Sequence, residues 1–136
     1  MGTETTLNLD PFTSSYTFHD LTEVADQEVG TYCIPSRSDQ AAIDSIQQPN
    51  YLFQMTVADE HGINATGLSN ALKQLRKDPK TDAELFFVVP PDQYPRWRKK
   101  QEYTGRSDSK VLRTVKQRVI KLPLQTWAHS LRFRAV

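Results

Sequence analysis

The sequence contains almost no cysteine, and several patterns that mark common catalytic sites are missing from it. Cys33 is the single cysteine among 136 residues, which excludes an intramolecular disulfide and favours a small buried side chain in a strand. With one cysteine and three scattered histidines, a zinc site is not expected. The patterns GxGxxG, GxxxxGK[ST] and GxSxG are absent, so neither a glycine-rich phosphate loop nor a serine-hydrolase elbow is predicted.

Long apolar runs are absent as well. No stretch reaches the length of a membrane span, and the N-terminus has no apolar signal core, so no membrane partner is expected. The hydrophobic content of 38% and the charged content of 24% indicate a rather polar globular chain, not a disordered one. We therefore expect one domain over residues 1–136, with loose packing in residues 1–13, where no periodicity is visible.

Charge is strongly segregated along the chain, although the net charge is only +1. Residues 1–60 carry ten acids and one base, residues 61–95 carry four of each, and residues 96–136 carry twelve bases and two acids. This asymmetry indicates a C-terminal part that faces a polyanion. The alternative is that the two parts neutralise each other, within one chain or between two copies in a homodimer.

The periodicity predicts a mixed α/β or α+β fold. Residues 51–57 alternate, with Gln54 and Thr56 on the less apolar face. The run 83–90 is the most apolar in the chain and does not alternate, which indicates a strand covered on both faces. The leucines at 68, 72 and 75 mark one face of a helix that Asn64 or Thr66 can cap. The expected order is a short helix after residue 20, strands near 31–35, 41–46 and 51–57, the helix, and strands at 83–90 and 115–122. A terminal helix over residues 124–136 is also expected.

Asp44 lies among apolar neighbours on the predicted strand 41–46, where a buried carboxylate requires a partner or a cation, unless it is a surface residue of an edge strand. A turn of three or five residues brings Asp44 and Gln54 to the same face of the hairpin, whereas a four-residue turn places Asp44 opposite Phe53. We predict the odd turn. The predicted core cluster is Phe53, Met55, Leu68, Leu72, Phe86 and Val88.

The basic part of the chain is also rich in aromatic residues. Tyr94, Trp97 and Tyr103 lie among its cations, an arrangement that suits a phosphate backbone and stacked or packed rings. The alternative use of this region is contact with another protein. The candidate nucleic-acid-binding residues are Arg96, Arg98, Lys99, Lys100, Arg106, Lys110, Arg113, Lys116 and Arg118.

Four motifs of the chain resemble the C-terminal region of Crinkler and retrotransposon-hot-spot (RHS) effector proteins. They are Ile34-Pro35 followed by IDSI at 43–46, YLFQMTVADEH at 51–61, LFFVVP at 85–90 and KQRVIKLPL at 116–124. The resemblance spans residues 31–124, and the string QMTVA-x2-H followed by LFFVVP is its most specific part. It implies a nuclease-like domain with the core of the PD-(D/E)XK restriction-endonuclease superfamily, in a secreted effector that acts in a host nucleus on DNA or on a host protein.

By this resemblance, Asp44 corresponds to the aspartate of the superfamily, and Gln54 and Thr56 occupy the positions of its acid-x-lysine pair. Asp44 is then the expected Mg²⁺ ligand, with Glu23 or Glu28 completing the site, and His61 is the candidate general base. Gln54 is a weaker ligand than a carboxylate, and Thr56 lacks the charge of lysine. The resemblance therefore leaves two functions open: metal-dependent phosphodiester hydrolysis, or a catalytically inactive module that binds nucleic acid or protein.

Overall fold

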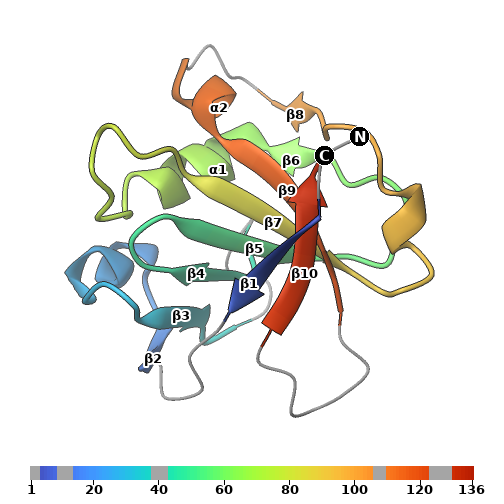
Figure 1. Ribbon diagram of the computed structural model, residues 1–136. Coiled ribbons are helices and arrows are strands. Elements are labelled where there is room, and N and C mark those ends of the chain that lie inside the picture. Colours follow the sequence, from blue (N-terminus) through green and yellow to red (C-terminus); the bar gives the residue numbers. More distant parts are fainter. Residues whose placement is uncertain (1–3, 9–13, 38–42, 106–109, 123–129) are drawn as a thin grey trace.

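A mixed sheet of eight strands dominates the computed structural model, which describes residues 4–8, 14–37, 43–105, 110–122 and 130–136 (Figure 1). Its order is β1-β10-β9-β7-β5-β4-β3-β2. In chain order, the strands are Thr5–Asn8 (β1), Ser15–Phe18 (β2), Tyr32–Pro35 (β3), Ser45–Gln47 (β4), Tyr51–Met55 (β5), Glu84–Val89 (β7), Lys116–Lys121 (β9) and Ser130–Ala135 (β10). The smaller elements are the pair β6 (Ile63–Asn64) and β8 (Tyr103–Thr104), the helices α1 (Ala65–Leu72) and α2 (Lys110–Thr114), and the 3₁₀ helices η1 (Leu21–Asp26) and η2 (Tyr94–Arg96).

The central part of the fold has the order predicted from the sequence, and its class is α+β with a mixed sheet. β4 and β5 form an antiparallel hairpin, α1 follows, and β7 pairs with β5 in parallel. The side chain of Asn64 caps α1 by accepting a hydrogen bond from the Gly67 N–H at 2.8 Å. β7 lies between β5 and β9, which explains why its apolar run shows no alternation.

The two faces of the sheet carry separate apolar clusters. On the face that α1 covers, Leu52, Leu85 and Phe87 belong to one cluster with Leu68 and Leu72 of the helix. On the opposite face, Phe53, Phe86 and Ile120 form a second cluster with Tyr32, Tyr51 and Val88. Figure 1 draws α1 behind β5 and β7, and β1 and β10 in front of them.

The predicted single core cluster is therefore wrong. Phe53 and Phe86 lie on one face of the sheet, while Leu68 and Leu72 cover the other. Met55 is 57% exposed because β5 ends at this residue, beyond the part of the strand that other side chains cover. Alternation along a strand separates two faces, but it does not say that both are covered.

Both chain ends differ from the expectation. The predicted terminal helix is wrong, because Ser130–Ala135 form β10, which pairs with β9 on one side and β1 on the other. The sequence of this segment alternates apolar residues with arginine, the period of a strand. Residues 5–8, expected to pack loosely, form β1 against β10. Trp127, expected in that helix, lies outside the described residues.

Candidate functional site

Asp44 and Gln54 lie side by side, as the odd turn requires. The turn between β4 and β5 consists of the three residues 48–50, and Ser45 pairs with Phe53. One step further along the hairpin, Asp44 stands opposite Gln54, and the Gln54 Nε2 donates a hydrogen bond to the Asp44 Oδ2 at 3.0 Å. The prediction of an odd turn is confirmed.

The Asp44 carboxylate fastens the open end of this hairpin. Its Oδ2 also accepts a hydrogen bond from the backbone N–H of Met55 at 2.6 Å, and the Asp44 N–H donates to the Phe53 carbonyl at 3.0 Å. One carboxylate oxygen, on the residue directly before β4, thus accepts hydrogen bonds from a backbone donor and a side-chain donor of β5. The half-buried position of Asp44 is explained by these bonds without a cation.

Thr56 and Gln54 line different cavities, and His61 borders both. Gln54 and His61 line a cavity of about 270 Å³ under Phe87, whereas Thr56 and His61 line one of about 420 Å³ with Met55 at its rim. The Thr56 Oγ1 accepts a hydrogen bond from the Ala58 N–H at 3.1 Å, so it caps the strand end. The loop after β5 thus brings His61 beside the cavities that Gln54 and Thr56 line.

His61 is held by its backbone. The His61 N–H donates to the Oε1 of the buried Gln101 at 2.6 Å, and Gln101 in turn binds Gln117 of β9. The ring lies 6.4 Å from the Phe87 ring, and its Nδ1 is buried with no hydrogen-bond partner in the described part of the chain. His61 thus shares one cavity with Gln54 and another with Thr56, while no described group binds its Nδ1.

The groups around Asp44 do not form a set of ligands that fits a Mg²⁺ ion. Mg²⁺ prefers several carboxylate and water oxygens in octahedral geometry, while the Asp44 Oδ2 already accepts two N–H groups. Glu23 caps η1 by accepting from the Asp20 N–H, and its hydrogen bond from the Tyr16 hydroxyl lowers the pKa of its carboxyl. Among the described residues, no group of three or more Asp, Glu, His or Cys is arranged to hold a metal.

Cys33 has the buried role expected for it. It is fully buried in β3, and burial raises the pKa of its thiol to about 11. A thiol with this pKa is almost entirely protonated at neutral pH, so it is a poor nucleophile.

Most cations of the C-terminal part are exposed, and we refer to them together as the basic surface. Arg106 lies outside the described residues. Arg118 is half-buried, and the exposed members are Arg96, Arg98, Lys99, Lys100, Lys110, Arg113 and Lys116. In the described part of the chain, Lys116 pairs with Asp82 at 3.8 Å and Arg118 pairs with Glu84 at 3.1 Å. Neither acid belongs to the first 60 residues, so these pairs are not the neutralisation that the charge asymmetry left open.

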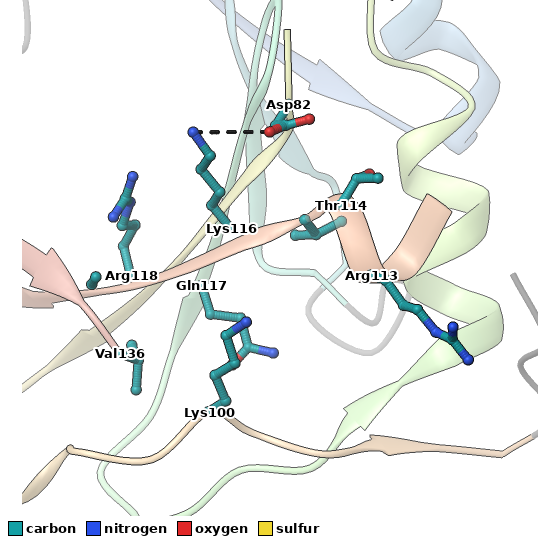
Figure 2. Close-up of a pocket in the computed structure, with 10 residues that line it drawn as sticks. Asp82, Lys100, Arg113, Thr114, Lys116, Gln117, Arg118 and Val136 are labelled. Carbon is teal, nitrogen blue, oxygen red and sulfur yellow. Dashed lines mark ion pairs between the residues drawn. The ribbon is translucent and has the colours of Figure 1, made fainter. Parts of the chain in front are cut away.

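Four of these cations gather around one hollow of about 450 Å³ (Figure 2). Lys116 and Arg118 project from β9, Arg113 comes from the end of α2, and Lys100 comes from the segment before β8. Asp82 lies at the rim, in its ion pair with Lys116. We call this site the basic hollow.

The aromatic residues of this region are part of the core, contrary to a role in base stacking. Trp97 is fully buried and lies 5.2 Å from the Phe87 ring, while Tyr94 is 7% exposed. Tyr103 is half-buried, and its hydroxyl donates to the Leu112 carbonyl at 2.8 Å. The Trp97 ring is also covered toward a protein partner, whereas Arg98, Lys99 and Lys100 in the same segment are exposed.

Sequence reasoning missed Asp82 and Glu84 as partners of the β9 cations. The signal lies in the parallel register of β7 and β9, which places Glu84 opposite Lys116. It also missed Arg134, whose guanidinium donates to the carbonyls of Tyr94 and Trp97 at 2.6 and 2.7 Å. Arg134 thus joins β10 to η2 by hydrogen bonds and stabilises the fold, unlike the exposed cations.

No protein-family model matches the chain, and a search of curated proteins and of solved structures finds no match either. In the part of the chain that the structure describes, no helix has the length and apolar character needed to cross a membrane. The features that bear on function are therefore the geometry of Asp44, Gln54 and His61 and that of the basic surface.

Proposed function

We propose that the chain is a nucleic-acid-binding module that holds the phosphate backbone on its basic surface and does not cut it. The observation that carries this proposal is the basic hollow, which is lined by cations from β9, α2 and the segment before β8. Lys100 and Arg113 lack a hydrogen-bond or ion-pair partner within the described ranges, so their charge is available to a polyanion.

The surface proposed to bind the ligand consists of cationic side chains, and the Trp97 and Tyr94 rings next to them in the sequence are buried. Side chains that neutralise phosphates bind nucleic acid with little dependence on sequence, while preference for single strands usually comes from aromatic stacking. Because Trp97 and Tyr94 are buried, we propose duplex DNA as the ligand and expect weak sequence preference.

Within this proposal, the resemblance to Crinkler and RHS effectors suggests the kind of core, the place of action and an additional partner. The α+β sheet with a hairpin, a helical crossover and a parallel strand is compatible with the proposed restriction-endonuclease-like core. A host nucleus as the place of action, and a host protein as an additional partner, follow from the resemblance alone. The proposed module is an inactive relative, because the Asp44 carboxylate serves the hairpin.

Charge reversal on the basic surface is expected to weaken duplex binding. For the wild type, log K against log salt should fall with a slope of about −3.6 if four phosphates are neutralised, at about −0.9 for each contact. The triple variant Arg98→Glu, Lys99→Glu, Lys100→Glu should bind more weakly and show a shallower slope, for any duplex sequence. Fluorescence anisotropy of labelled duplexes over a range of salt concentrations measures both quantities.

The matched control reverses three cations elsewhere, at the end of α1 and in the following loop: Lys73→Glu, Lys77→Glu and Lys80→Glu. The change in net charge is the same, so an equal loss of affinity in both variants would assign binding to overall charge and not to the basic surface. Absence of DNA and RNA binding by the folded wild type at low salt would contradict the proposal and favour a protein partner.

Metal-dependent phosphodiester hydrolysis is the competing function, favoured by the contact of Asp44 with Gln54 and by the nearness of His61 to Gln54. We expect plasmid and single-stranded DNA to stay intact with Mg²⁺ or Mn²⁺, for the wild type and for Asp44→Ala alike. Asp44→Ala should instead lower stability by about 1–3 kcal/mol, because the Met55 N–H loses its acceptor. Asp44→Asn, which keeps an acceptor oxygen, should lose less.

Cleavage by the wild type that depends on metal and disappears in both Asp44 variants would establish hydrolysis. Chemical denaturation of the same preparations separates loss of the hairpin bond from loss of a metal ligand. Loss of the hairpin bond should lower stability more in Asp44→Ala than in Asp44→Asn, whereas loss of a metal ligand should affect cleavage in both variants alike.

A further inference from the structure

The basic hollow is concave and lies at an interruption of the sheet. β10 ends at Ala135, which pairs with Arg118, so the first residues of β9 extend beyond the last residue of β10. Lys116 lies in this extension, and Arg113 precedes it at the end of α2 (Figure 2). Lys100 faces the same space from a segment distant in sequence. The hollow that these cations line has a volume of about 450 Å³.

The polar neutral groups of the hollow are already engaged. The Thr114 hydroxyl donates to the Val111 carbonyl at 2.6 Å. The Gln117 amide donates to the Gln101 carbonyl at 3.0 Å and accepts from the Gln101 N–H at 2.7 Å. A ligand in the hollow is therefore met chiefly by ammonium and guanidinium groups, which selects for anions of high charge density.

The charge balance distinguishes the kind of anion. Four cationic side chains and one carboxylate side chain, that of Asp82, line the hollow, so the side chains alone leave a local excess of three positive charges. The Glu84 carboxylate behind Arg118 reduces this excess to about two, which is comparable to the charge of about −1.5 to −2 that a phosphate monoester carries at pH 7. A backbone phosphodiester carries one charge and exposes fewer free oxygens.

We infer that the basic hollow binds a terminal phosphate monoester, the phosphorylated end of a nucleic-acid strand. Arg113 and Lys100 supply the donors that have no other partner among the described residues, and Lys116 and Arg118 add charge from the floor. The inference deepens the proposed function, since the rest of the basic surface would hold the backbone that leads to this end.

The test compares short blunt duplexes of one sequence that differ only at their ends. Duplexes with 5′-phosphates, with 3′-phosphates and with hydroxyl ends are titrated by anisotropy at one ionic strength. We expect one of the phosphorylated forms to bind roughly tenfold more tightly than the hydroxyl form, about 1.4 kcal/mol. A hydroxyl-ended duplex one base pair longer controls for added charge, and it should bind like its parent. Inorganic phosphate should abolish the preference when chloride of equal ionic strength does not.

Two single variants locate the effect. Arg113→Gln and Lys100→Gln should each remove most of the preference for the phosphorylated end, while hydroxyl-ended duplexes lose no more affinity than they lose to Lys110→Gln. Lys110→Gln is the matched control, because Lys110 is an exposed cation of the same helix but does not line the hollow. Thermal unfolding checks that all three variants are folded, as expected for exposed side chains.

The outcomes separate the two proposals. Equal affinity for phosphorylated and hydroxyl ends, with the steep salt slope retained, would overturn the terminal-phosphate site and leave backbone binding intact. A preference that survives both variants would also overturn it, because the phosphate is then bound elsewhere. Absence of affinity for every duplex would overturn both, and binding of a phosphoserine peptide in that case would identify a protein ligand.

Discussion

Phe86→Ala is expected to lower the free energy of unfolding by about 3–5 kcal/mol, the usual loss when a buried aromatic side chain is removed from a core. Phe86 is 1% exposed on the face of the sheet opposite α1. Its ring stacks on that of Phe53 at a centroid distance of 5.4 Å and meets the edge of Tyr51 at 5.3 Å. The second cluster is small, so the cavity left by the phenyl ring would border most of its members.

Met55→Ala is the matched control for this prediction. Met55 was expected in the same core from its alternation with Phe53, but it is 57% exposed at the end of β5. Its truncation should change stability by no more than about 0.5 kcal/mol. Urea denaturation with an unchanged midpoint for Phe86→Ala would contradict the structure of this face, as would equal losses for the two variants.

Gln48→Ala is expected to cost about 3 kcal/mol or more, a large effect for a polar residue in a turn. Gln48 is 1% exposed, and its amide satisfies three backbone groups. The Nε2 donates to the carbonyls of Val24 and Gln74 at 2.7 and 2.8 Å, and the Oε1 accepts from the Arg76 N–H at 2.8 Å. Each buried group left without a partner costs about 1–3 kcal/mol.

Gln47→Ala provides the comparison at the neighbouring position. Gln47 is half-buried and makes one long hydrogen bond of 3.4 Å to the Gly30 carbonyl, so its loss should be well under half of that for Gln48. Chemical denaturation, with circular dichroism as the readout, compares the two. Similar losses at both positions would show that the buried amide does not join the turn to η1 and to the end of α1.

These stability predictions bear on the candidate sites through the hairpin. Gln48 positions the turn of β4 and β5, and Phe86 supports β5 from the second face. The contact between Asp44 and Gln54 depends on both, because the three-residue turn sets the register that makes them opposite. Variants of Asp44 should therefore be compared only with preparations whose hairpin is shown to be folded.

The sequence by itself determined the features that depend on local spacing. Alternation located β5, the apolar run located β7, and the leucine spacing with Asn64 located α1. The odd turn was predicted because the site hypothesis requires Asp44 and Gln54 on one face, and the two-residue period of paired strands then brings them together. These inferences need only neighbours in the chain and the geometry of one hairpin.

Only the tertiary structure decided which surfaces are covered and which charges remain available. The alternation in β5 could not show that Phe53 has a covered face while Met55 is exposed, since that depends on strands distant in sequence. The basic and aromatic spacing from Tyr94 onward suggested stacking, but packing against Phe87 buries Trp97. The parallel register of β7 and β9 and the end of β10 at Ala135 then give Arg118 and Lys116 nearby acids and leave Arg113 and Lys100 around an open hollow. Such long-range pairing depends on how all the strands assemble into the sheet, and no local pattern in the chain specifies that assembly.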